Sequence, residues 1–460
     1  MKKVLETETI GVIPPHKRHG KPSDLFAVWV GVNMLLLTAI TGGLGTTVFN
    51  LPLVDAFVAL CIGCLVGGLA MALHSAQGPH LGVPQMIQSR GQFGSYGSFI
   101  ITVLVVVIYM GWLASNLVAS GLAFSNLVPG MATWQGILLL TAANVLVVIF
   151  GYRAIHFMMK VGAILVGLGF VWAIVMIFYG GHVTAATFSQ GEFTIAGFTG
   201  TVTAAALWVV AFAPYVSDYS RYLPQGTGNK PAFWATYTGV VIGSMLPMTF
   251  GILVGSCIQG NDIISGISLL LGPAGAYLLW SATITTSFSN AVNLYGAVLC
   301  SITAVQTFKE DFIPGAKART WYAIVLGSIA FVVGYAGHDN FLSMLMNVIS
   351  LIFFTITPWT AVNLVDYYLV KGGSYDVDSF FKRNGGIYGK WSMPALISYF
   401  VGLALQIPFL KTDLYTGPMV ALLDDTDVSW IVGLVLTSIL YYLISSKPGL
   451  GASASYSVSK

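Results

Sequence analysis

Hydroxyl and amide side chains are concentrated in one otherwise apolar stretch of the sequence, between Ser281 and Asn293. Two helical faces of this stretch carry most of them. The first face consists of Thr283, Thr286, Asn290 and Asn293, and the second of Thr285, Ser289 and Asn293. Neutral oxygens suit a weakly bound monovalent cation, and amides can pair with both donors and acceptors on a small molecule. The stretch therefore predicts a binding site rather than simple helix packing.

A second candidate surface lies between Tyr109 and Asn116. Tyr109, Trp112 and Asn116 are spaced i, i+3 and i+7, which places them on one face of a helix. A flat aromatic ring with an amide beside it suits a planar heterocycle. A Tyr and Trp pair alone would equally fit packing or a membrane-interface anchor. Asn116 lies deep within the apolar run, and this favours a binding role.

Two further segments combine polar residues with residues that break helices. Asn33, followed by the glycines at 42–45, is typical of a helix with an interrupted middle. Asn33 is a candidate binding residue, and the alternative is a hydrogen bond that only joins neighbouring helices. Pro214 follows shortly after Trp208 and removes a backbone donor, which frees carbonyl oxygens for a cavity or an ion.

Asp218 and Arg221 lie three residues apart near the end of the same apolar run. They could pair as part of an inner gate, or they could cap the helix, and the sequence leaves both interpretations open. The sequence contains no HExxH motif, phosphate-binding glycine loop or histidine cluster. It therefore predicts neither an intramembrane enzyme nor an ATPase, and no organic cofactor or metal centre is expected.

The composition indicates that these polar residues lie within a membrane. Of the 460 residues, 56% are hydrophobic and only 8% are charged, and the mean hydropathy is +0.81. Soluble domains carry about 25% charged residues, so a soluble enzyme is excluded. A net charge of +3 is too small to suggest nucleic acid as a partner.

Apolar runs between polar, glycine and proline breaks predict twelve membrane-spanning helices, because a span needs about 20 mostly apolar residues. They are expected at 25–47, 53–75, 97–127, 133–151, 160–180, 197–223, 232–257, 273–305, 320–337, 341–370, 392–410 and 428–446. We number them spans 1 to 12. The connections are mostly short, so no separate extramembrane domain is expected.

The distribution of positive charge predicts the orientation. Of the 20 Lys and Arg residues, all but Lys411 fall in the terminal segments and the even-numbered loops. Cytoplasmic loops are enriched in Lys and Arg. Both termini are therefore expected in the cytoplasm, with Lys411 on the outer face.

A weak internal repeat completes the prediction of the fold class. The segments Ala27-Val-Trp29-Val and Ala206-Leu-Trp208-Val match at an offset of 179 residues, which also places span 3 on span 8. A repeat of five helices must invert in the membrane, as in secondary transporters with interrupted helices and a midplane site. We expect an all-α membrane protein with two inverted repeats, in which spans 1 and 6 are interrupted.

Three motifs together resemble the nucleobase:cation symporter-1 (NCS1) family, and most closely its purine–cytosine permease branch. They are Ser217-Asp218-Tyr-Ser-Arg221-Tyr-Leu-Pro, Ser289-Asn290-Ala-Val-Asn293-Leu-Tyr295 and Asp366-Tyr-Tyr-Leu-Val-Lys-Gly-Gly-Ser-Tyr-Asp376-Val-Asp378. The resemblance implies a leucine-transporter-like fold of ten core helices plus two peripheral helices. The expected organisation is a tail at 1–24, a core at 25–370 with repeats 25–180 and 197–370, a cytoplasmic loop at 371–391, peripheral helices at 392–446 and a tail at 447–460.

The resemblance also implies roles for individual residues in binding a base. Trp112 and Asn116 fit the Trp-x-x-x-Asn spacing of fungal purine–cytosine permeases, and Trp208 fits the aromatic residue of span 6 more loosely. Asn293 fits the second amide of the span 8 motif, and Ser289 stands in the place of the first. Asn290 aligns with a base-contacting amide of bacterial cytosine permease.

The coupling ion is left open between sodium and a proton. Sodium-coupled members hold the ion between span 1 and hydroxyls of span 8. Gly31, Thr285 and Ser289 fit that pattern, but Phe288 stands where a hydroxyl is expected. Proton-coupled fungal members carry a glutamate near the start of span 5, where this chain has Met159.

The expected function is therefore secondary active import of cytosine or a purine across the cell membrane, driven by a cation gradient through alternating access. The expected partners are a nucleobase, a proton or sodium ion and the lipid bilayer. Within transport, the alternative is another flat heterocycle such as allantoin, a hydantoin, uracil or a hydroxymethylpyrimidine. A membrane receptor or channel on a transporter fold is the alternative from another class.

Overall fold

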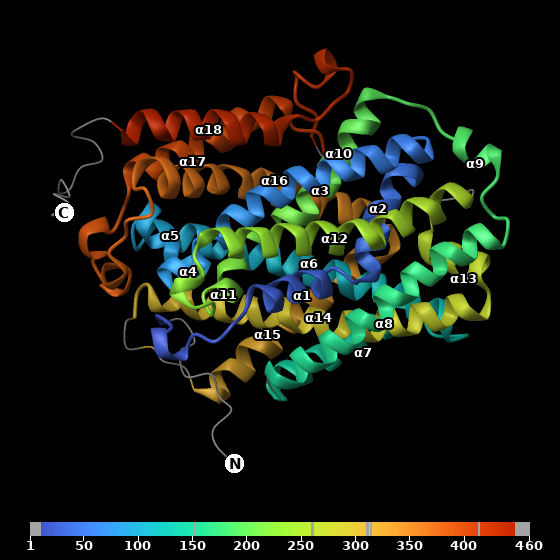
Figure 1. Ribbon diagram of the computed structural model, residues 1–460, viewed down its shortest axis with the longest axis horizontal. Coiled ribbons are helices and arrows are strands. Elements are labelled where there is room, and N and C mark those ends of the chain that lie inside the picture. The colour runs from blue at the N-terminus through green and yellow to red at the C-terminus, as the bar shows by residue number, and fades with distance from the viewer. Residues whose placement is uncertain are drawn as a thin grey trace.

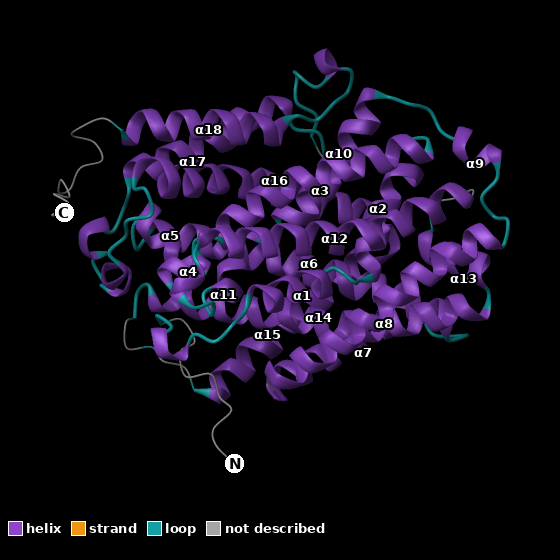
Figure 2. Cartoon of the chain, in the orientation of Figure 1, coloured by secondary structure: helices purple, strands orange, loops and turns teal. Residues whose placement is uncertain are grey.

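The computed structural model describes residues 11–150, 152–258, 262–309, 312, 315–412 and 415–446. These residues form helices and loops, with one isolated β-bridge between Lys411 and Thr416 (Figure 2). The long helices run roughly parallel to the longest axis of the molecule (Figure 1). Short helices and loops gather at the two ends, which is the arrangement of a helical bundle that crosses a membrane.

The helices of the first half of the chain begin with the broken pair α1 and α2 and end with α9. Their bounds are α1 Pro22–Val32, α2 Leu36–Thr47, α3 Leu53–Ser75, α4 Gly78–Leu81, α5 Gln85–Phe93, α6 Gly97–Leu127, α7 Thr133–Phe150, α8 Tyr152–Tyr179 and α9 Ala185–Ser189. The second half contains α10 Ile195–Val210, α11 Val216–Ser220, α12 Asn229–Cys257, α13 Ile263–Leu271, α14 Pro273–Gln306, α15 Ala316–Gly337, α16 Phe341–Val365, α17 Met393–Gln406 and α18 Ser429–Ser445.

Each of the twelve predicted spans corresponds to one of these helices or, for spans 1 and 6, to the pairs α1–α2 and α10–α11, whereas α4, α5, α9 and α13 lie between spans. By length and composition, seven apolar helical segments of the described residues can cross a membrane, and the bent pair α1–α2 makes an eighth. One of the seven, at 317–370, contains both α15 and α16. The shorter apolar helices α7, α17 and α18 supply the remaining three spans. The all-helical fold class is therefore confirmed.

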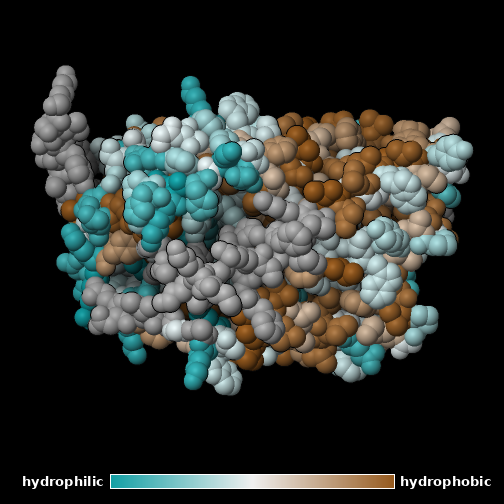
Figure 3. Space-filling model, turned by 60° about the horizontal axis from the view of Figure 1, so that its bottom comes forward, coloured by the Kyte–Doolittle hydropathy of each residue, from teal (hydrophilic) through white to brown (hydrophobic). Residues whose placement is uncertain are grey.

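The outer surface of the helices matches a lipid environment. Large apolar side chains such as Leu69 of α3, Leu168 of α8 and Val332 of α15 are exposed, with 47%, 63% and 62% of their surface accessible. Hydrophobic residues cover much of the face seen in Figure 3, whereas hydrophilic residues gather at its left end. A soluble monomer rarely exposes apolar patches of this extent.

Span 1 is interrupted as predicted, and the interruption falls at Asn33. Helices α1 and α2 meet at an angle of 63° across Asn33, Met34 and Leu35. The side-chain amide of Asn33 donates to the Trp29 carbonyl at 2.7 Å. This side chain takes the place of the backbone donor that a continuous helix would supply.

Span 6 is interrupted more gently, at Ala211–Tyr215. Pro214 has no N–H to donate, and a single 3₁₀ turn at Ala213–Tyr215 joins α10 to α11. Both interruptions bring loop-like backbone to the middle of the bundle.

The glycines at 42–45 do not interrupt span 1, because they lie inside α2. A Cβ at Gly42 would overlap the backbone of Met248, and a Cβ at Gly251 would overlap the Ala39 carbonyl oxygen. Thr46 also donates to the Ile252 carbonyl at 3.3 Å. These glycines therefore let α2 and α12 pack backbone to backbone, as small residues do between membrane helices.

The segment between spans 2 and 3 folds into α4 and α5 instead of a simple loop. Every residue of α5 is buried although its mean composition is polar. Gln77 donates to Asn363 of α16 at 2.8 Å, and Arg90 donates to the Phe380 carbonyl at 2.9 Å. Hydrogen bonds to distant segments thus satisfy the polar groups that a sequence pattern would place in water.

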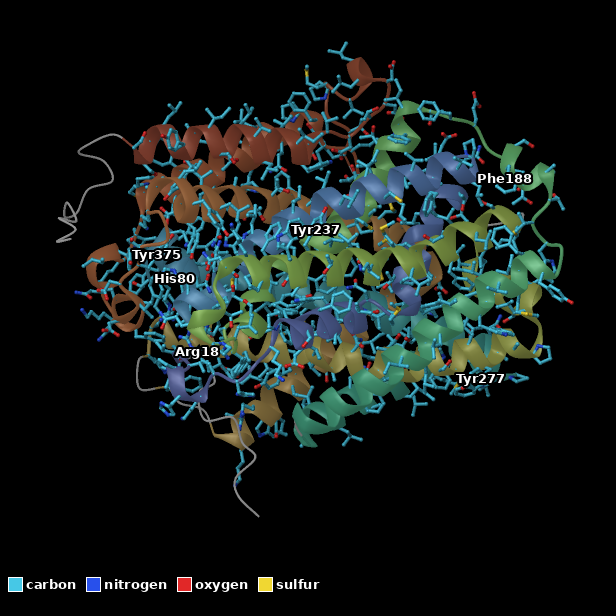
Figure 4. All side chains as sticks on the ribbon, viewed as in Figure 1. Arg18, His80, Phe188, Tyr237, Tyr277 and Tyr375 are labelled. Atoms are coloured by element: carbon cyan, nitrogen blue, oxygen red, sulfur yellow. The ribbon has the colours of Figure 1, made fainter. Side chains whose placement is uncertain are left out.

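The loop after α16 is tied to the same end of the molecule. Asp366, which is 1% exposed, accepts hydrogen bonds from Tyr375 and from Tyr441 of α18 and forms an ion pair with Lys371 at 2.9 Å. Burial and the neighbouring carboxylate raise the pKa of Tyr375 well above its usual value, so Tyr375 remains a donor. His80, Tyr375 and Arg18 mark this end in Figure 4, and Phe188 and Tyr277 mark the opposite end.

Candidate ligand-binding site

A small cavity lies where the interruptions of spans 1 and 6 face spans 3 and 8. Its wall is formed by Val32, Leu35, Trp112, Asn116, Trp208, Phe212, Tyr215, Ser289 and Asn293. Five of the seven residues that the sequence predicts to contact a ligand therefore lie on one wall. The cavity volume is about 20 Å³, close to the minimum that holds one water molecule. A base can enter only when the surrounding rings separate.

The aromatic side chains of the wall are arranged for such a separation. The Trp112 and Trp208 rings meet edge to face, with centroids 5.0 Å apart and an interplanar angle of 74°. Phe212 packs between Trp208 and Tyr215, and its ring centroid lies 6.3 Å from that of Trp208 and 5.7 Å from that of Tyr215. Edge-to-face contacts leave the face of one tryptophan available to a flat ligand when the other swings away.

Asn33 lies behind the wall and positions Trp208. Its side-chain oxygen accepts hydrogen bonds from Trp208 Nε1 at 2.6 Å and from Ser244 Oγ at 3.1 Å. Its amide nitrogen donates to Trp29, and the side chain is fully buried. Because these bonds occupy its donor and acceptor groups, we interpret Asn33 as a residue that joins span 1 to spans 6 and 7.

Asn116 and Ser289 present polar atoms that the described part of the protein leaves unpaired. The Asn116 nitrogen donates to the Trp112 carbonyl at 2.9 Å, but its oxygen has no hydrogen-bond partner among the described residues. The Ser289 hydroxyl likewise has no hydrogen-bond partner among the described residues. Both residues are almost completely buried, at 2% and 3% exposed. An unpaired buried polar atom costs about 1–3 kcal/mol, so a ligand that supplies partners would bind here favourably.

Asn293 adds a further polar group to the wall, and Asn290 supports it from behind. Asn293 lines the cavity and donates to the Asn290 oxygen at 3.1 Å. Asn290 is buried behind it and donates to the Leu113 carbonyl of α6 at 3.2 Å. Asn290 therefore braces α14 against α6 and orients the amide of Asn293.

Replacing Asn290 by alanine should lower ligand uptake by about tenfold or more, because Asn293 and the Leu113 carbonyl would both lose a partner. The measurement is uptake by the purified variant in proteoliposomes, with thermal unfolding as the check on folding. Uptake at the unaltered rate would show that Asn290 does not support the site.

Two of the residues predicted to bind a cation, Gly31 and Thr285, contact neighbouring residues of α8. Gly31 of α1 faces Ala163, with 3.2 Å between an added Cβ and the alanine methyl, and Thr285 of α14 packs on the adjacent Gly162. Ser289 lies one turn from Thr285, on the cavity wall. However, the Gly31 carbonyl accepts from the N–H groups of both Asn33 and Met34. The side chain of Met159 lies outside the described residues.

Asp218 and Arg221 lie on and just beyond α11, at the end of the molecule that carries α4 and α5. Asp218 Oδ1 accepts a hydrogen bond from the Gln85 backbone N–H at 2.9 Å. Arg221 Nε donates to the Asp218 carbonyl at 3.3 Å, and Arg221 is 3% exposed. Asp218 therefore joins span 6 to the first turn of α5.

The sequence did not identify Phe212 and Tyr215 as wall residues. Phe212 is four residues from Trp208, and Tyr215 directly follows Pro214, so helical spacing and the break could have indicated them. Tyr109, which shares a face with Trp112, stacks on Tyr215 with ring centroids 4.9 Å apart. This pair lies next to the cavity on the α11 side.

Comparisons with known proteins show which family the chain resembles. Residues 12–433 match the family described as permeases for cytosine/purines, uracil, thiamine and allantoin. YxlA of Bacillus subtilis, which is named provisionally as a purine–cytosine permease, is 37% identical over 98% of both chains. The purine–cytosine permease fcyB of Emericella nidulans is 23% identical over 91% of this chain and 84% of its own.

The fold is shared with a solved transporter structure. The inward-facing conformation of Mhp1 superposes with a TM-score of 0.76, at 17% identity, over 96% of this chain and 94% of that one. A closed conformation of Mhp1, described as a nucleobase-cation-symport-1 family transporter with bromovinylhydantoin bound, gives a TM-score of 0.75. The predicted leucine-transporter-like fold is therefore confirmed.

Proposed function

Because this chain belongs to the nucleobase:cation symporter-1 family of permeases for cytosine and purines, uracil, thiamine and allantoin, we propose that it imports cytosine or a purine together with a cation. The chain is a multi-pass membrane protein of a transporter family rather than an enzyme family. Cytosine and purines are the substrate class named for its purine–cytosine permease relatives.

The observation that carries this proposal is the cavity between two tryptophans with unpaired polar atoms on its wall. Trp112 and Trp208 supply aromatic faces, and stacking of a base on such a face contributes about 1–3 kcal/mol. The Asn116 oxygen accepts hydrogen bonds, whereas the Ser289 hydroxyl and the Asn293 amide can also donate them. Cytosine and the purines carry ring N–H or amino donors beside ring nitrogen acceptors, so their edges match this set.

Selectivity follows from the same atoms. A heterocycle that cannot donate to Asn116 would leave its buried oxygen unpaired, and sites built on such bonds discriminate strongly. Uracil, allantoin and hydantoins also carry N–H donors and are therefore the competitors against which the site must be compared.

We further propose that the protein lies in the cell membrane with both termini in the cytoplasm. The support is the charge distribution, because Arg18, Arg90 and Lys371 all lie at the end that carries α4 and α5. The opposite end carries Lys411, which pairs with Asp425. No organic cofactor is needed for this function, and a sodium ion and a proton are the candidate coupling ions.

The test is uptake of labelled cytosine into proteoliposomes under separately imposed proton and sodium gradients. Adenine, guanine, hypoxanthine, uracil, allantoin and bromovinylhydantoin serve as unlabelled competitors. We expect saturable accumulation under one gradient and inhibition by purines. If cytosine is not taken up and another heterocycle is, that heterocycle is the substrate. Flux that does not saturate and ignores both gradients would indicate a channel.

A further inference from the structure

Asp218 lies one helical turn from the cavity, on its α5 side. Tyr215 lines the cavity, and Asp218 follows three residues later in α11. Asp218 is partly exposed, whereas Tyr215 is only 5% exposed. The carboxylate therefore lies between the buried wall of the cavity and the end of the molecule that carries α4 and α5.

A pair of stacked tyrosines lies at the cavity wall, one helical turn before Asp218. The rings of Tyr109 and Tyr215 have centroids 4.9 Å apart and an interplanar angle of 28°. The Asp218 carboxylate interacts electrostatically with both tyrosine hydroxyls and with the thiol of Cys300 in α14. The carboxylate charge therefore acts on residues of α6, α14 and the interruption of span 6, which surround the base site.

The same carboxylate holds α11 to α5. Asp218 Oδ1 accepts from the N–H of Gln85, the first residue of α5, at 2.9 Å. The preceding residue, Pro84, supplies no side-chain cap. A negative charge is favourable at a helix N-terminus, and a neutral carboxyl group loses this advantage. The junction between α11 and α5 therefore depends on whether Asp218 is ionised.

Other titratable groups approach Asp218 from the elements packed around it. Arg221 lies next to it at the end of α11, and Ser217 Oγ donates to the carbonyl of His74 in α3. His80 belongs to α4 and Arg90 to α5, which both pack against α11. Together with Tyr109, Tyr215 and Cys300, these are the titratable groups that surround the carboxylate.

The buried carboxylate of Asp366 has a different environment. It is bonded to Lys371, Tyr375 and Tyr441, and it is 1% exposed. Asp366 is therefore suited to a structural role, whereas Asp218 is partly exposed and lies one helical turn from the cavity residue Tyr215.

We propose that Asp218 is the site that binds the co-transported proton, an inference that rests on the proposed function. The ionised form bonds to α5 and keeps the inner side closed. When the cavity is open to the outside and loaded with a base, an outside proton reaches the carboxylate through the cavity, and the carboxylate becomes neutral. The weakened bond to α5 then lets α11 move, and the base leaves inward. Release of the proton to the cytoplasm restores the ionised carboxylate and closes the inner side.

Such coupling is reciprocal, because a proton that favours the loaded state must itself bind more tightly when the base is present. The accumulation of base under a proton gradient should therefore depend on Asp218. Exchange of labelled for unlabelled base across the membrane, which needs no net proton movement, should not.

The experiment compares the wild-type protein with Asp218→Asn and Asp24→Asn in proteoliposomes. An asparagine at 218 keeps an oxygen that can accept from Gln85 but carries no charge, so it stands for the neutral, protonated form and can neither take up nor release a proton. Asp24 caps the N-terminus of α1 by accepting from Lys21 at 3.0 Å, away from the cavity, and is the matched control. We expect Asp218→Asn to lose about tenfold or more of proton-driven accumulation, within the usual range of coupling factors, while exchange continues. Asp24→Asn should behave as wild type.

Proton-driven accumulation at the wild-type level in Asp218→Asn would overturn the proposal. Wild-type accumulation under a sodium gradient alone would also overturn it and would leave the proposed function intact. A second measurement uses only the wild-type protein. Addition of cytosine to this protein in weakly buffered detergent should draw protons from solution, as read by a pH-sensitive dye. If no protons are taken up, the proposal is contradicted. Failure of the wild-type protein to exchange any base would instead refute the proposed function.

Discussion

Replacing Asn116 by alanine is expected to weaken base binding by about 5- to 150-fold, the equivalent of one buried hydrogen bond of about 1–3 kcal/mol. Asn116 lines the cavity, is 2% exposed and carries an oxygen without a partner among the described residues. The alanine variant removes this acceptor, so a bound base would keep an N–H group unpaired. The measurement is the Kd for cytosine, read from quenching of the tryptophan fluorescence of the purified protein.

Asn144 provides a matched control for this prediction. Its nitrogen donates to the Leu140 carbonyl at 2.8 Å, its oxygen has no partner within the described structure, and it is 1% exposed. It therefore resembles Asn116 in every local respect, but it lies on α7 and is not part of the cavity wall. Asn144→Ala should change the thermal stability as Asn116→Ala does and leave the Kd unaltered. Equal weakening of binding in both variants would show that Asn116 acts through folding alone.

Replacing Gly251 by alanine is expected to destabilise the protein by more than about 3 kcal/mol, beyond the usual cost of overpacking a core. The added methyl group would overlap the Ala39 carbonyl oxygen and approach the Gly43 nitrogen at 2.9 Å. These are backbone atoms, so no side chain can move aside. The contact between α2 and α12 must open, and α2, the second half of span 1, would lose its support.

Gly167 of α8 is the control for Gly251, because both glycines lie inside apolar helices. The nearest atom to a Cβ at Gly167 is the Met34 sulfur at 3.4 Å, an ordinary contact with a flexible side chain. Alanine is also the better helix former. Gly167→Ala should keep the wild-type midpoint of thermal unfolding in detergent, whereas Gly251→Ala should reduce folded yield severely. A midpoint for Gly251→Ala close to that of wild type would contradict the packing described here.

Several features of the protein follow from local properties of the sequence. Hydropathy alone identifies the spans, because each must supply enough apolar residues to cross the membrane. The break in span 1 is visible at Asn33 and that in span 6 at Pro214, since both residues disturb the hydrogen bonds of their own helix. Helical spacing likewise brings Trp112 and Asn116 to one face and Ser289 and Asn293 to another, and the structure places both faces on the same cavity.

The same local rules do not distinguish polar residues that bind from polar residues that support. Asn33, Asn116 and Asn290 are all buried asparagines in broken or polar-rich spans, and the sequence treats them alike. The structure separates them through their distant partners. Asn33 bonds to Trp208 and Ser244, and Asn290 bonds to Leu113 and Asn293. Of these three asparagines, Asn116 alone lines the cavity, and its oxygen has no partner among the described residues.

The sequence by itself therefore determined the membrane class, the spans, the interruptions and the polar faces, because these depend on residues close together along the chain. The tertiary structure decided how the glycines at 42–45 are used, how α5 becomes buried, and which atoms are left for a ligand. The physical reason is that hydrogen bonding and close packing depend on what lies opposite in space. Asp218 shows this most clearly, since its partner Gln85 is 133 residues away along the chain.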